Sequence, residues 1–116
     1  MKPTLTEIVA AYQAQDFKPI RRIFTLHAKG VDHVCPLVAL AIHRGVVDRA
    51  DPGIEIDGGA NLALSWGSDL WSFEFVVGIL DGWDGQEQAK DIHDYVEGYQ
   101  LGVAAAQQLS PLDPGL

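Results

Sequence analysis

The sequence predicts a compact, mainly α-helical α+β domain with four or five helices and one short β element. Three observations predict this class. Apolar residues recur at intervals of three and four near both ends of the chain, as on the buried face of a helix. An apolar segment bounded by Pro36 and Gly45 has the end signals of a helix. Residues 20–28 alternate in polarity as a strand does. The alternative is a larger antiparallel sheet that includes residues 71–79.

The first predicted helix covers residues 5–15. It opens with the capping box TLTE, in which Thr4 accepts a backbone hydrogen bond and Glu7 reaches back. Its apolar stripe is formed by Leu5, Ile8, Val9 and Tyr12. Pro19 ends any continuation, and the strand over residues 20–28 follows, with residues 54–56 as its candidate partner.

The central predicted helix covers residues 36–44 and should be buried on nearly every side. Pro36 suits the first helical position, and His43 and Arg44 suit the carbonyl end. Gly45 can take the left-handed conformation that closes a helix. The residues between these ends are all apolar, which is typical of the centre of a core.

The segment from residue 60 to residue 80 is ambiguous. A short helix over residues 60–66 could end at Gly67, after which Ser68 could cap the next element. Residues 69–80 fit both a strand and a helix, because their apolar positions match both periods. We favour a helix that ends at Gly82.

The last predicted helix covers residues 86–109 and carries two stripes. The first consists of Ala89, Ile92, Val96, Tyr99, Val103 and Ala106, at the seam spacing of packed helices. The second consists of Gly98, Gly102, Ala105 and Leu109, whose small members would allow another backbone to come close. One stripe can face the core and the other a partner.

Residues 81–85 read DGWDG, which raises the question of a metal or phosphate loop. A calcium loop needs oxygen ligands where this segment has Trp83 and Gly85, and a phosphate cradle would be repelled by the two aspartates. The segment therefore predicts a turn in which Gly82 ends one helix, Asp84 or Gly85 caps the next and Trp83 folds over the joint.

Composition and charge exclude several classes of protein. The chain of 116 residues fits one domain, which we place at residues 1–110 with a coil tail at 111–116. Sixteen acidic and eight basic residues give a net charge of -8, so we expect no binding to nucleic acid. No apolar run approaches the ~20 residues of a membrane helix, so we expect no membrane association. The single cysteine fits a cytoplasmic location.

The residues that could form a site are few. Cys35 stands at a helix start, where the helix dipole favours a thiolate, and His33 is a possible base. These two are the catalytic candidates. Trp66, Trp71 and Trp83 could line a pocket for a flat ligand. The four histidines lack metal-binding spacing, so we expect neither a metal nor another cofactor.

These features predict a small acidic interaction module and not an enzyme. We expect it to self-associate as a homodimer or to bind a protein partner, and the acidic residues between 81 and 97 could meet a basic protein. The alternative is a small-molecule-binding protein or an enzyme with a site near Cys35 and the aromatic residues.

Overall fold

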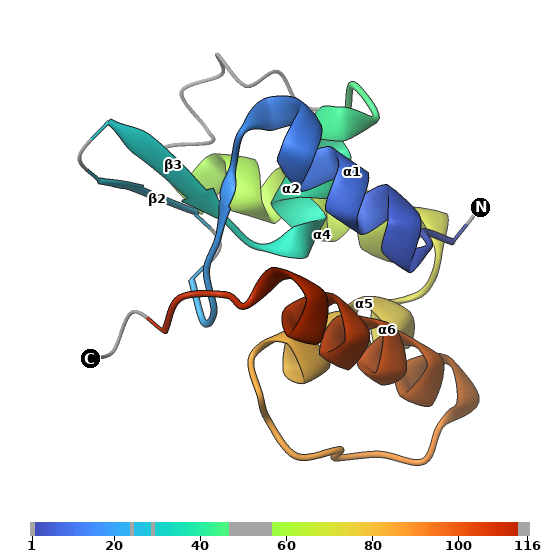
Figure 1. The fold of residues 1–116 in the computed structure, drawn as a ribbon. Coiled ribbons are helices and arrows are strands. Elements are labelled where there is room, and N and C mark those ends of the chain that lie inside the picture. Colours follow the sequence, from blue (N-terminus) through green and yellow to red (C-terminus); the bar gives the residue numbers. More distant parts are fainter. Residues whose placement is uncertain (1, 24, 29, 47–56, 114–116) are drawn as a thin grey trace.

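The computed structural model describes residues 2–23, 25–28, 30–46 and 57–113 and confirms the predicted fold class. Within this part of the chain, five helices form most of the molecule, and a small three-stranded sheet lies at one side of it (Figure 1). The helices are α1 (Leu5–Gln15), α2 (Pro36–His43), α4 (Asp57–Leu70), α5 (Phe73–Trp83) and α6 (His93–Leu109). The strands are β1 (Lys18–Pro19), β2 (Thr25–Ala28) and β3 (Val31–Val34).

Helix α1 has the predicted bounds, but only half of the predicted capping box forms. The Thr4 hydroxyl accepts a hydrogen bond from the Glu7 backbone N–H over 3.2 Å. The Glu7 carboxylate instead binds the Arg44 guanidinium, with two N···O distances of 2.7 Å. Glu7 therefore joins α1 to the end of α2, and the arginine lowers the pKa of Glu7 below its usual range.

The prediction of one strand over residues 20–28 is wrong in detail. The chain turns at Arg22, whose φ of 64° is left-handed, so that β1 and β2 become separate strands. Both pair with β3, which the sequence analysis missed; β1 is parallel to β3 and β2 is antiparallel to it. The candidate partner at residues 54–56 lies outside the described residues.

Helix α2 is the centre of the core, as predicted. Every residue from Pro36 to Ile42 is buried, and the helix contacts α1, α4 and α5. Gly45 has a φ of 76° and closes the helix by donating to the Ile42 carbonyl. The local end signals therefore placed this helix correctly.

The break between α4 and α5 lies four residues later than predicted. Helix α4 continues through Gly67 and Ser68, and Ser72 caps α5 by accepting from the Phe75 N–H over 3.1 Å. Gly67 serves close packing, because a Cβ there would lie 3.2 Å from the Val76 side chain. Residues 73–83 are helical, so the alternative of a larger sheet through residues 71–79 is wrong.

Helices α5 and α6 pack as a parallel pair with their backbones in contact, and residues 84–92 return beside them (Figure 1). Gly78 and Gly82 of α5 face backbone atoms of α6, and Gly98 and Gly102 of α6 face backbone atoms of α5. The prediction that another backbone packs against the glycine stripe is confirmed, and that backbone is α5. Gly82 does not end α5, which continues to Trp83. This glycine instead allows the backbone of α6 to come close to α5.

The predicted helix over residues 86–109 is too long, since α6 begins at His93. Its buried side carries Tyr95, Gly98, Gly102, Ala105 and Ala106, so the seam predicted from the first stripe is mostly wrong. Ile92 is 51% exposed, and Ala89 lies in the extended connection. Apolar spacing alone could not show that the glycine side would be preferred for packing.

Candidate functional site

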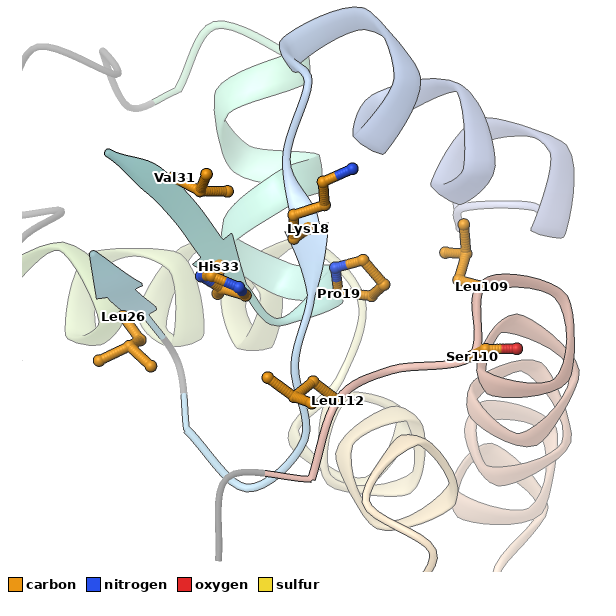
Figure 2. A pocket seen from close by; sticks show the side chains of 8 residues that line it. All are labelled: Lys18, Pro19, Leu26, Val31, His33, Leu109, Ser110 and Leu112. Atoms are coloured by element: carbon orange, nitrogen blue, oxygen red, sulfur yellow. The ribbon is translucent and has the colours of Figure 1, made fainter. Parts of the chain in front are cut away.

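A groove of about 750 Å³ lies on one face of the sheet, between the strands and the end of α6. Figure 2 shows the residues that line it: Lys18, Pro19, Leu26, Val31, His33, Leu109, Ser110 and Leu112. Most of these side chains are apolar. Its volume is within the range of about 300–1,000 Å³ that is usual for small-molecule sites.

The floor of the groove is a row of three side chains across the sheet. Lys18 of β1 pairs in register with His33 of β3, and Leu26 of β2 pairs with His33 from the other side. Residues in register on neighbouring strands project from the same face, and Val31, two residues before His33, shares that face. Val34 projects from the opposite face and is buried in the core.

The chain after α6 forms a wall of the groove. Ser110 has a φ of 50°, which ends the helix, and Leu112 then lies beside β1. The Leu112 N–H donates to the Pro19 carbonyl over 3.0 Å, and its carbonyl accepts from the Arg21 N–H over 2.9 Å. Two backbone hydrogen bonds thus place the Leu112 side chain, which is 54% exposed, beside the groove.

The polar groups of the groove are cationic or neutral. Lys18 is the only charged residue among the eight that line it, in a chain with a net charge of -8. His33 is half-buried, and its Nδ1 is buried without a hydrogen-bond partner in the described structure. The tautomer with its proton on Nε2 leaves only a lone pair unpaired at Nδ1 and makes Nε2 a hydrogen-bond donor.

The structure does not bring Cys35 and His33 into one site. Cys35 is buried in the core, where desolvation raises the pKa of its thiol to about 12. It faces a separate cavity of about 60 Å³ lined by Arg22, Ile23, Leu80 and Asp84, whereas His33 lines the groove. Burial therefore outweighs the helix dipole, and the thiolate that the position at the helix start suggested is disfavoured.

Two of the three candidate tryptophans lie together, but an arginine already covers them. Trp66 and Trp71 meet edge to face with ring centroids 5.1 Å apart. The Arg44 guanidinium lies 5.9 Å from the Trp66 ring centroid and 5.3 Å from that of Trp71, while it binds Glu7. The cluster is a set of mutually satisfied side chains, and none of them lines the groove.

Trp83 lies elsewhere and joins α5 to the sheet. It is fully buried, stacks on Tyr12 at 5.8 Å between ring centroids, and donates its indole N–H to the Ile20 carbonyl over 2.7 Å. Trp83 therefore does not fold over a joint between two helices, as the sequence suggested, and instead anchors the end of β1.

The other residues of DGWDG also have structural partners. Asp81 accepts from the Tyr95 hydroxyl over 2.7 Å. Asp84 ends α5 and accepts from the Arg22 N–H over 2.7 Å, so its predicted role as the cap of the next helix is wrong. Gly85 has a φ of 77°, as the chain turns away from α5.

The described residues form neither a metal site nor a membrane-spanning helix. No group of three or more His, Cys, Asp or Glu side chains in the described ranges is arranged to hold a metal ion. No described helix combines the length and the apolar character needed to cross a membrane.

The sequence analysis missed the groove because its residues come from three distant segments. One weak signal was present: two short alternating runs flank Lys29 and Gly30, and a glycine between two such runs suits a hairpin turn, although Lys-Gly is not among the preferred turn pairs. The hairpin would have placed Leu26 and His33 side by side. Nothing local predicts that residues 109–112 return to β1.

The fold and the groove together define a small α+β protein with a ligand-sized hollow on its sheet. Comparison of the chain with protein-family models, with curated proteins and with solved structures gave no match.

Proposed function

We propose that the protein is a non-catalytic binding module whose groove receives a small, mainly apolar ligand. The observation that carries this proposal is the groove itself: about 750 Å³, walled by Leu26, Val31, Leu109 and Leu112, with only a few polar groups. Exposed apolar side chains that form a concave surface gain the most from a ligand, because the ligand removes them from water.

The composition of the groove supports binding over catalysis. His33 could transfer a proton, but a nucleophilic mechanism also needs a partner within hydrogen-bond reach. Figure 2 shows Ser110, the only hydroxyl among the eight described lining side chains, well away from His33 at the end of α6. The buried Cys35 faces a different cavity.

The first test measures binding of decanol, a neutral apolar probe, by competition with an environment-sensitive fluorophore. We expect decanol to bind the wild type and Leu26→Glu or Leu112→Glu to weaken it strongly, because each substitution places a charge among apolar walls. Phe73→Glu is the matched control, since Phe73 is 63% exposed and lies outside the groove. Decanol binding that is absent, or equally weakened by all three substitutions, would refute the proposal.

A second candidate function is self-association through the apolar end of the α5–α6 pair. We define this end patch as Leu70, Phe73 and Ile92, which are 46%, 63% and 51% exposed. Ser72 donates to Asp94 over 3.1 Å, and Lys90 binds Glu74 over 3.0 Å. These two contacts flank Phe73 and Ile92 in the chain, so both side chains emerge at the same end of the helix pair.

A second copy of the chain is the occupant we propose for the end patch, because a two-fold pair would cover three exposed apolar side chains at once. We expect analytical ultracentrifugation to show a dimer that Phe73→Glu dissociates and Leu26→Glu does not. A wild type that stays monomeric at high micromolar concentration would remove this candidate. A cytoplasmic location remains our proposal as well, supported by the lone cysteine.

A further inference from the structure

We propose that the ligand of the groove is a monocarboxylate with an apolar chain, and that Lys18 and His33 recognise its carboxylate. This inference rests on the proposed binding function and adds the chemical class of the ligand. It predicts a polar end of the bound molecule at the β1–β3 pair and an apolar chain along the leucines.

The positions of Lys18 and His33 on neighbouring strands suit a shared ligand. Lys18 and His33 are partners in register on neighbouring parallel strands, and both line the groove. Figure 2 shows the Lys18 ammonium turned away from the His33 ring, so binding of one ligand by both side chains requires a rotation about the flexible lysine stem. Lys18 provides an ammonium group on a flexible stem, and His33 provides a ring donor at Nε2. Two donors on adjacent strands suit the two oxygens of one carboxylate.

The charge of the described groove residues is positive in an otherwise acidic protein. Among the eight described residues that line the groove there is no aspartate or glutamate, although the chain has sixteen acidic and eight basic residues. In the described part of the chain, no acidic side chain forms an ion pair with Lys18, whereas Lys2, Arg22, Arg44 and Lys90 all have acidic partners. A cationic groove on an acidic protein favours an anion over a neutral or cationic ligand.

Apolar side chains line the groove on both sides of His33. Leu26 and Val31 lie on β2 and β3 on one side of His33, and Leu112 and Leu109 lie on the other side, on the chain after α6 and at the end of α6 (Figure 2). A chain of methylene groups that starts at Lys18 and His33 therefore meets apolar side chains. Each buried CH₂ contributes about 0.8 kcal/mol, so chain length should increase affinity.

The test compares decanoate with decanol, which share a chain and differ in charge. We expect the wild type to bind decanoate roughly fivefold or more tightly than decanol, the ratio expected for one charge-assisted contact at a partly exposed site. Lys18→Met keeps the apolar stem and removes the charge, so it should reduce this preference to the part that His33 contributes and leave decanol binding unchanged. Lys90→Met is the matched control, because Lys90 binds Glu74 outside the groove, and it should keep the preference.

His33 is tested by two substitutions. His33→Gln retains a side-chain N–H donor and should keep part of the preference for decanoate, whereas His33→Phe should lose the contribution of the histidine.

The outcomes separate the two proposals. If decanol and decanoate bind the wild type equally and in the groove, the carboxylate inference is wrong and the binding function stands. If Lys18→Met keeps the full preference, the inference is likewise wrong. If neither compound binds, the proposed function itself fails.

Discussion

Gly102 of α6 lies so close to Ile79 of α5 that a Cβ atom on the glycine would fall against the Ile79 carbonyl oxygen. The same Cβ would lie 2.8 Å from the Trp83 backbone nitrogen. Gly98, Gly78 and Gly82 repeat this relationship along the two helices. Such close approach brings Cα–H groups to carbonyl oxygens and gives extensive van der Waals contact.

The first prediction follows from this contact. Gly102→Ala should lower the free energy of unfolding by on the order of 3 kcal/mol or more, because the methyl group meets rigid backbone on the facing helix. Gly67→Ala is the matched control. Its Cβ would meet only side chains, Val76 at 3.2 Å and Trp71 at 3.3 Å, and alanine is the better helix former by about 1 kcal/mol. Urea unfolding that shows equal losses for the two variants would mean that α5 and α6 are not in backbone contact.

The second prediction concerns the buried hydrogen bond of Trp83. Trp83→Phe removes the indole donor to the Ile20 carbonyl and should cost about 2 kcal/mol, since a buried acceptor loses its partner. Tyr99→Phe is the comparison, because it also removes a donor to a backbone carbonyl, that of Gln86, but at an exposed position. Thermal unfolding should show a clearly larger decrease in melting temperature for Trp83→Phe than for Tyr99→Phe. The reverse order would contradict the placement of Trp83.

The third prediction concerns Cys35 and alkaline pH. Burial raises the pKa of its thiol from 9.0 to about 12, so the unfolded chain loses this proton at a lower pH than the folded protein. The contribution of Cys35 to stability is therefore complete below pH 9 and is lost between about pH 9 and pH 12. Cys35→Ala should lose less stability than the wild type over this pH range. Alkylation at pH 8 should be negligible until the protein unfolds, and rapid labelling of the native protein would disprove the burial.

The fourth prediction concerns Asp84. Desolvation raises its carboxyl pKa, while the backbone N–H of Arg22 donates to it over 2.7 Å. A raised acid pKa contributes stability at low pH that is lost as the pH rises through the folded value. The stability of the wild type relative to Asp84→Asn should therefore fall as the pH rises from below the ordinary carboxyl pKa of 3.8 through the higher pKa of the folded protein. Asp84→Ala, which also removes the acceptor, should be less stable than Asp84→Asn by about 1 kcal/mol. A wild-type advantage that grows with pH in this range would show that the carboxylate is favoured in the fold.

The sequence predicted those elements whose ends are set by local chemistry. Thr4 starts α1, and Pro36 and Gly45 bound α2, because caps and turns depend on neighbouring residues alone. Gly67 and Gly82 misled the prediction, since a glycine that ends a helix and one that makes room for a packed neighbour look identical in sequence. The neighbour is a pair of side chains at Gly67 and the backbone of α6 at Gly82. Tertiary packing decides between the two uses.

The prediction that residues 86–92 are helical failed for a related reason. The apolar residues Ala89 and Ile92 continue the spacing of α6, but the Ala89 N–H donates to the Tyr95 hydroxyl and Lys90 reaches Glu74. These side-chain contacts hold the segment outside the helix. The groove was beyond sequence analysis in the same way, because Lys18, His33 and Leu112 meet only through strand pairing.

The central claim is that the open face of the sheet binds a ligand, and intermolecular nuclear Overhauser effects from decanol test it most directly. The account predicts contacts from the alkyl protons to the methyl groups of Leu26, Val31, Leu109 and Leu112. Contacts to Trp66 and Trp71 or to the end patch instead, or no contacts at concentrations that saturate the wild type, would contradict it.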